Sequence, residues 1–163
     1  MQTASTQTET AAVLDDKVAG QTIASRWLDT VAAHPDLVAL RAKDGDGWVE
    51  LTYAEVADRV ARTAAGLGAL GVGPGDRVVM MMRNIPEFHI VDLAVMICGA
   101  TPISIYNSSA PDQIAYLAGH SGARVAIVED MGFAEPCVAL RGRRSAKKKS
   151  RHRTDPSRPA PWS

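Results

Sequence analysis

The sequence predicts an α/β fold, with an incomplete, layered and mostly parallel sheet followed by a disordered basic tail. Two observations predict this fold. Apolar, strand-like runs alternate with helix-periodic segments from Arg77 to Glu129, and the short connections between them imply right-handed crossovers. The run Val78–Met82 is apolar without alternation, which is typical of a strand covered on both faces of a parallel sheet.

A first helix is expected to follow a leader without regular structure. Residues 1–21 are rich in Thr, Ala, Gln and Ser and lack an apolar period, so we expect them to be disordered. Thr22 is the expected N-cap, and Pro35 predicts an end near His34 because proline disfavours a helical residue before it. The apolar face of this helix repeats every four residues: Ile23, Trp27 and Val31.

A hairpin and a second helix are expected next. The strand-like runs Leu37–Ala42 and Trp48–Leu51 flank two Asp-Gly pairs, which is a hairpin signal. Thr52 and Glu55 have the spacing of a capping box and open a helix for which Gly71 is the natural stop. The predicted apolar face of that helix consists of Val56, Val60, Thr63, Ala64, Leu67 and Leu70.

The remaining elements build the predicted sheet. Gly73–Asp76 forms a turn into the strand Arg77–Met82. Pro86 stands near the first position of a helix that reaches about Cys98 and, being apolar almost all round, should be buried. Three more elements follow in order: the strand Thr101–Tyr106, the helix Pro111–His120 with its end at Gly122, and the strand Arg124–Glu129. We expect this partial domain to occupy residues 22–138 and the disordered basic tail to occupy residues 139–163.

The formal net charge of zero conceals two oppositely charged segments. Residues 1–140 hold nine basic and seventeen acidic side chains, a net charge of −8, whereas residues 141–163 hold nine and one, a net charge of +8. Such a basic tail is expected to bind nucleic acid or acidic lipid weakly and in a salt-dependent way. Out-of-frame translation of a GC-rich reading frame would give the same composition, so both interpretations of the tail stay open.

The remaining composition predicts a cytoplasmic protein. No apolar run approaches the roughly 18 residues that a membrane helix needs, so we expect no transmembrane segment. The first residues have neither the basic start nor the apolar core of a secretory signal. Cys98 and Cys137 do not make a disulfide framework and are expected to be small buried hydrophobes.

The motifs that suggest chemistry fail in their context. Gly71–Gly75 resembles a phosphate loop, but it follows a helix and opens a strand, which indicates a structural turn. Asp44–Asp46 with Glu55 hints at a calcium loop, but the further oxygen ligand and the glycine of such a loop are missing. Ser121 would need a glycine at position 123 to form a nucleophile elbow, and Ala123 stands there. The four histidines show no metal-ligand spacing. We therefore assign no catalytic, cofactor-binding or metal-binding residue.

Three blocks in one order resemble the adenylate-forming (AMP-binding) superfamily. They are Leu51–Val56, then Gly71–Val78 followed by Asn84–Phe88, and finally Gly99–Ala110. Within the last block, Tyr106–Ser109 is similar to the long-chain fatty acid–CoA ligase branch. The resemblance spans about residues 22–135, and the shared order of the blocks makes it specific.

The resemblance implies a large two-domain enzyme that condenses a fatty acid with ATP, using Mg²⁺, and then forms the acyl-CoA thioester. Four elements of the family have no counterpart here: the phosphate loop, the magnesium carboxylate, the ribose-binding aspartate and the catalytic lysine. The resemblance therefore assigns no residue to ATP, CoA or Mg²⁺ and leaves enzyme activity open. We expect a truncated N-terminal part of such a ligase, inactive alone. The alternative is a non-catalytic binding module that pairs with a full-length ligase subunit, self-associates through exposed edges, or binds polyanions through the tail.

Overall fold

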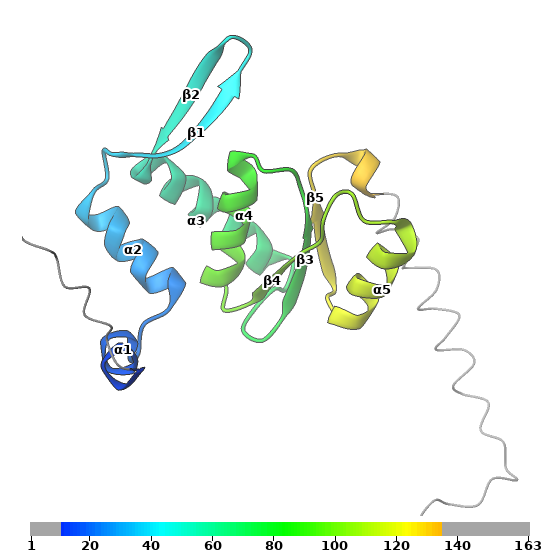
Figure 1. The fold of residues 1–163 in the computed structure, drawn as a ribbon, viewed down its shortest axis with the longest axis horizontal. Helices are drawn as coiled ribbons and strands as arrows, with labels where there is room; N and C mark the ends of the chain where they lie inside the picture. Colours follow the sequence, from blue (N-terminus) through cyan, green and yellow to red (C-terminus); the bar gives the residue numbers. More distant parts are fainter. Residues whose placement is uncertain (1–10, 135–163) are drawn as a thin grey trace, which may run out of the picture. The chain divides into compact units, whose positions relative to one another are not determined.

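A computed structural model of the protein describes residues 11–134 (Figure 1). The chain divides after Ala61 into two compact units, and helix α3 (Tyr53–Ala69) runs through the division. The other elements of the first unit are α1 (Ala11–Val18), α2 (Ile23–Ala33), β1 (Val38–Asp44) and β2 (Gly47–Thr52). Those of the second unit are β3 (Arg77–Met81), α4 (Pro86–Ile97), β4 (Thr101–Ser104), α5 (Pro111–Ser121) and β5 (Val125–Val128).

Helix α1 corrects the expectation of a disordered leader. Its sequence, AAVLDDKV, contains Ala, Leu and Lys, which favour helix without any apolar period. The side chains of Val13 and Val18 are exposed, so propensity rather than burial explains the helix. The rest of the predicted leader before residue 11, and the predicted basic tail, lie outside the described residues.

The predicted cap and end of α2 are confirmed. The Ser25 backbone N–H donates to Thr22 Oγ1 at 3.0 Å, and the Thr22 backbone N–H donates to Ser25 Oγ at 2.9 Å. At the other end, His34 donates its backbone N–H to the Thr30 carbonyl at 2.9 Å. Pro35 then prevents the helix from continuing.

The hairpin is also confirmed. Strands β1 and β2 pair antiparallel, with Asp44 opposite Gly47, so that two residues form the loop. The first loop residue, Gly45, has a φ of +56°, a conformation that only glycine adopts readily. At the base of the hairpin, the Tyr53 N–H donates to the Leu37 carbonyl at 3.0 Å.

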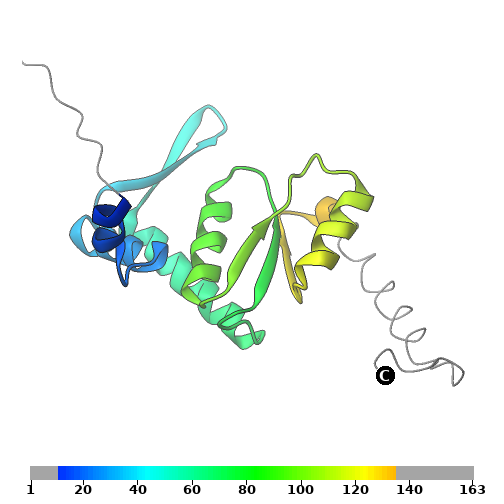
Figure 2. The same cartoon turned by 60° about the horizontal axis from the view of Figure 1, so that its bottom comes forward.

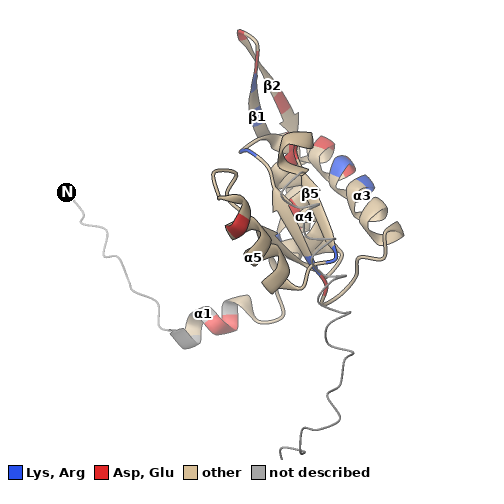
Figure 3. Ribbon diagram, turned by 90° about the vertical axis from the view of Figure 1, so that its right-hand side faces the viewer, with Lys and Arg blue, Asp and Glu red and all other residues tan. Residues whose placement is uncertain are grey.

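The capping box that opens α3 is present in full. Thr52 donates its backbone N–H to Glu55 Oε2 at 2.8 Å, and Glu55 donates its backbone N–H to Thr52 Oγ1 at 3.3 Å. These hydrogen bonds lower the pKa of Glu55 because they favour its ionised form. Acidic and basic residues are interspersed along the exposed part of α3 (Figure 3).

The predicted apolar face of α3 is correct except at its end. Val56, Val60 and Leu67 are buried, as the period predicts. Leu70 is 71% exposed instead, because the helix ends at Ala69 and the chain turns away at Gly71, where φ is +81°. The helical period therefore no longer applies to Leu70.

The second unit contains the predicted parallel sheet, with strand order β4-β3-β5 and both pairings parallel. All four apolar residues of the central strand, Val78–Met81, are buried, which confirms the expectation of a strand covered on both faces. Helices α4 and α5 lie on opposite sides of this sheet (Figure 2). On the α5 side, Val79 and Met81 form one core cluster with Ile114 and Ala118.

Helix α4 begins at Pro86 as predicted but is not buried all round. Its buried residues form one face: Ile90, Val91, Ala94 and Val95. Ile97, in the last turn, is 37% exposed, so hydrophobicity alone overestimated the burial of this helix. Cys98 caps the helix, and partial desolvation raises the pKa of its thiol. Cys137 lies outside the described residues.

Across residues 11–134, no helix is both long and apolar enough to span a bilayer.

Candidate functional site

The carboxyl ends of the three parallel strands meet at one edge of the second unit. In open α/β sheets this edge is where ligands bind, because the loops that leave the strands diverge there. Arg83 follows β3, Tyr106 follows β4, and Glu129 with Asp130 follows β5. Any functional group that this sheet positions is therefore expected at these residues.

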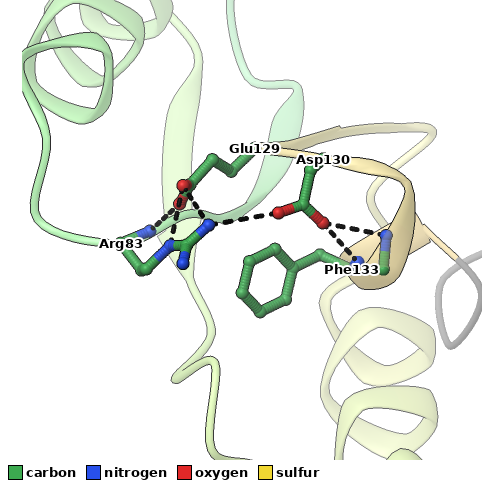
Figure 4. Close-up of polar contacts among 5 residues, drawn as sticks. Arg83, Glu129, Asp130 and Phe133 are labelled. Atoms are coloured by element: carbon green, nitrogen blue, oxygen red, sulfur yellow. Dashed lines mark hydrogen bonds and ion pairs between the residues drawn. The ribbon is translucent and has the colours of Figure 1, made fainter.

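Arg83 and Glu129 join the ends of β3 and β5 (Figure 4). The Arg83 backbone N–H donates to Glu129 Oε2 at 2.6 Å, and its side-chain Nε donates to Oε1 at 2.7 Å. The Glu129 side chain is 15% exposed, whereas that of Arg83 is 59% exposed. The hydrogen bonds and charge of Arg83 lower the pKa of the Glu129 carboxyl, and Glu129 in turn raises the pKa of Arg83.

Asp130 completes this cluster. Its Oδ2 lies 3.2 Å from an Arg83 guanidinium nitrogen, and its Oδ1 accepts the backbone N–H groups of Gly132 at 2.8 Å and Phe133 at 3.3 Å. The Phe133 ring lies 5.8 Å from the Arg83 guanidinium carbon and packs against the α5-side core (Figure 4). Arg83 is thus held by two carboxylates and a ring, an arrangement that braces the strand ends.

Two hollows open at the same edge and share Tyr106. One, of about 280 Å³, has Asn84, Ser104 and Asn107 among its lining residues. The other, of about 580 Å³, runs along the start of α5 and is lined in part by Tyr116. Amides, hydroxyls and aromatic rings can orient a neutral ligand, but they supply no cation for a phosphate.

The groups at the carboxyl edge of the sheet do not make a phosphate site like those that bind ATP. Phosphate sites use several converging donors that are free to bind, such as arginines, lysines or the N–H groups of a glycine loop. At the carboxyl edge, the charge of Arg83 is already taken by Glu129 and Asp130. We therefore derive no catalytic step from these residues.

The glycine-rich segment is a structural turn, as its sequence context indicates. It lies between α3 and β3, and the Gly73 N–H that a phosphate would need donates instead to Asp76 Oδ2 at 3.0 Å. The Asp76 backbone carbonyl accepts the Thr101 N–H at 2.9 Å, which joins the turn to the start of β4.

The residues of the other motifs also have structural roles. Asp44 and Asp46 belong to the hairpin and its turn, and residues 11–134 contain no group of three His, Cys, Asp or Glu side chains placed to hold a metal ion. Ser121 ends α5: its Oγ donates to the Ala118 carbonyl at 2.8 Å and accepts the Ala123 N–H at 3.2 Å. His120 stacks on Tyr116 with ring centroids 5.5 Å apart.

Sequence reasoning did not single out Arg83, Glu129 or Asp130. A signal existed, because charged residues directly follow two apolar strands that were predicted to be parallel. Which strands are neighbours could not be read from the sequence, so the pairing of Arg83 with Glu129 was not predictable. The assignment of no catalytic or cofactor residue stays a prediction.

The protein resembles known enzymes over most of its described length. The sequence profile of the family described as AMP-binding enzyme matches residues 27–160. This match continues past residue 135, the expected end of the resemblance.

Several relatives match at moderate identity. An uncharacterized protein of Mycobacterium tuberculosis is 38% identical over 108 residues, which cover 66% of this chain and 61% of that protein. Triostin synthetase I of Streptomyces triostinicus is 39% identical over 63% of this chain and 19% of its own length. The long-chain-fatty-acid–CoA ligase FadD15 of Mycobacterium bovis is 33% identical over 66% of this chain and 18% of its own length. The chain thus spans less than two thirds of each of these proteins.

Solved structures agree with the fold. The N-terminal domain of FACL13 from Mycobacterium tuberculosis superposes with a TM-score of 0.67 at 28% identity, covering 74% of this chain and 30% of that one. The N-terminal subdomain of Klebsiella oxytoca NpsA gives a TM-score of 0.61 at 28% identity, covering 67% and 28%. Both likenesses support the α/β architecture.

Proposed function

This chain belongs to the AMP-binding enzyme family and corresponds to part of the N-terminal domain of its adenylate-forming members, and from that premise we propose that it is a structural part of a long-chain fatty acid–CoA ligase. In this proposal the chain does not adenylate an acid by itself. It provides the parallel sheet and its carboxyl edge, while the groups that bind ATP, Mg²⁺ and CoA come from elsewhere in the ligase.

One observation carries the proposal. At the edge of the sheet where ligands bind, the arginine is neutralised by Glu129 and Asp130. Adenylation needs positive charge or metal aimed at the transferring phosphate. The cluster can hold two strand ends together, but it has no free cation with which to stabilise such a transition state.

The fatty-acid branch is supported by two likenesses. Tyr106–Ser109 is similar in sequence to that branch, and the relatives include the ligase FadD15. Triostin synthetase I matches at higher identity over a similar share of the chain, so the acyl class is the part of the proposal that most needs a test.

A chimera tests the branch. Residues 22–134 of this chain would replace the matching segment of a mycobacterial long-chain ligase, and in parallel that of an adenylation domain from triostin synthetase I. If the segment belongs to the fatty-acid branch, we expect the ligase chimera to form palmitoyl-adenylate and the synthetase chimera to lose adenylation of its own substrate. Activity in the synthetase chimera alone would contradict the fatty-acid assignment.

The basic segment supports a second candidate function. The net charge of +8 over residues 141–163 favours binding of a polyanion, driven by counterion release. Replacing Lys147, Lys148 and Lys149 by Gln in the full chain should lower the salt concentration that elutes it from heparin. Unchanged elution would count against this function. The exposed Lys43→Gln change, which removes a single positive charge outside the basic segment, is the control and should lower the elution salt less.

A further inference from the structure

The two outer strands of the parallel sheet differ in how their free edges are protected. Among the described residues, the order β4-β3-β5 leaves one side of β4 and one side of β5 without a neighbouring strand. In a strand, alternate residues point their backbone N–H and C=O groups to opposite sides. The residues that face outward therefore decide whether a further strand can pair.

The free edge of β4 is blocked by a proline. Thr101 donates its N–H to the Asp76 carbonyl at 2.9 Å, and Ile105 donates its N–H to the Met80 carbonyl at 2.9 Å. The odd-numbered residues of β4 thus face β3, and Pro102 occupies an outward position. Because proline has no N–H, it prevents a regular ladder along this edge, a common protection of edge strands.

Within residues 11–134, the free edge of β5 has no such protection. The Glu129 N–H donates to the Met81 carbonyl at 3.1 Å, so the odd-numbered residues of β5 face β3. Ala126 and Val128 consequently direct their N–H and C=O groups outward. Both keep their N–H, and strand pairing in the described part of the chain does not use this edge.

The charges at the two ends of β5 are complementary to each other. Arg124 precedes the strand with a side chain that is 69% exposed, and Asp130 follows it with one that is 48% exposed. Each has a partner within the chain: Arg124 lies 3.6 Å from Asp76, and Asp130 lies 3.2 Å from Arg83. Both side chains remain exposed enough to contact a further charged group.

Antiparallel geometry then selects one register between two copies of β5. Outward residues must oppose outward residues, and a two-fold axis at Ile127 sets Ala126 opposite the second copy's Val128. The same register sets Arg124 opposite the second copy's Asp130. A shift by two residues in either direction sets Arg124 or Asp130 opposite an apolar residue instead, so only the first register pairs the charges.

We propose that the free edge of β5 is a self-association surface, where a second copy of this chain adds its own β5 antiparallel. The interface has two-fold symmetry and joins the two three-stranded sheets into one. Its strands are short and its ion pairs are solvent-exposed, so the dimer is weak and salt-dependent. This inference goes beyond the proposed function and does not depend on any ligase chemistry.

The charge pairing is tested by a double-mutant cycle on the full chain. Dimer dissociation constants are measured by sedimentation equilibrium for Arg124→Gln, Asp130→Asn and the double variant. Asn keeps the Oδ1 acceptor that holds the turn at Gly132. We expect each single change to weaken the dimer by roughly 2- to 30-fold, since it removes two symmetry-related ion pairs, and the double variant to be no weaker than the worse single one. Lys43→Gln, on the hairpin, should leave the constant unchanged.

The strand pairing is tested by Ala126→Pro. This change removes an outward N–H and leaves the hydrogen bonds to β3 in place, so the variant should be a monomer with an unchanged circular dichroism spectrum. In the parent chain, the amides of Ala126 and Val128 should exchange more slowly as concentration rises. A chain that stays monomeric at all concentrations, a dimer that survives Ala126→Pro, or additive effects in the cycle would overturn the proposal.

Discussion

Arg83 binds the Glu129 carboxylate through both its backbone and its side chain, across 46 positions of sequence. The contact fixes the carboxyl end of β3 to that of β5, and Asp130 extends it to the turn that holds Phe133. Because Phe133 packs on the α5-side core, the brace also helps to cover that core. The stability of the second unit is therefore expected to depend on the Glu129 charge.

Removing that charge should destabilise the protein. Glu129→Gln keeps the size of the side chain but weakens its hydrogen bonds with Arg83, because bonds to a charged acceptor are stronger than neutral ones. We expect a lower Tm by calorimetry. Glu50→Gln, which breaks the exposed Arg41–Glu50 pair of the hairpin, is the matched control and should change Tm less. Equal effects of the two changes would show that the brace adds nothing beyond a surface ion pair.

The same contact predicts a loss of stability in acid. Arg83 lowers the pKa of Glu129 below its ordinary value of 4.5, chiefly by side-chain and backbone hydrogen bonding. The stabilisation is therefore complete above the pKa of the unfolded state and is lost as pH falls through the lower pKa of the folded state. Urea midpoints from pH 7 to pH 3 should show parent and Glu129→Gln converging below about pH 4.5. A difference of the same size at pH 3 as at pH 7 would contradict this assignment.

The pKa of Asp92 on α4 is shifted in the opposite direction, upward. Partial burial raises its pKa, with His89 opposing the shift, so the folded state favours the protonated form. Stability from this group is present below the pKa of the unfolded state and is lost as pH rises through the higher pKa of the folded state. Asp92→Asn should therefore raise the urea midpoint at pH 7 and leave it nearly unchanged at pH 3. A lower midpoint at pH 7 would indicate that the carboxylate is favourable where it lies.

The α5-side core should be the most sensitive to truncation. Ile114 is 1% exposed and packs with Val79 and Met81, so Ile114→Ala should cost about 2–5 kcal/mol of unfolding free energy. Leu117, on the same helix, is 41% exposed, and Leu117→Ala should cost about 1 kcal/mol or less. Urea denaturation of both variants measures the contrast. Comparable losses would mean that α5 packs on a different face from the one seen.

The local elements of this fold were largely predictable. Caps at Thr22 and Thr52, the first-turn position of Pro86 and the stop at Gly122 each depend on residues within a few positions, and the structure confirms them. Val78–Met81 revealed a buried parallel strand because its apolar run lacks alternation. Each of these features was predictable because the residues that cause it lie close to it in the sequence.

The errors and omissions have non-local causes or lie at element ends. Leu70 is exposed because α3 ends one residue before it, and Ile97 is exposed because burial depends on which face of α4 meets the sheet. The order β4-β3-β5 and the Arg83–Glu129 contact depend on tertiary pairing, which periodicity does not encode. The candidate site was missed for that reason, although Glu129 ends one predicted strand and Arg83 and Asp130 directly follow predicted strands.

The most direct test of the proposed function is an adenylation assay of the 163-residue chain itself. Pyrophosphate exchange into ATP and formation of palmitoyl-CoA are measured with palmitate, CoA and Mg²⁺. A cooperative melt first shows that the purified chain is folded, and a full-length long-chain ligase is the positive control. We expect no exchange above the enzyme-free rate, because the arginine at the sheet edge is neutralised by two carboxylates. Exchange that depends on palmitate and Mg²⁺ and scales with the concentration of the chain would contradict it.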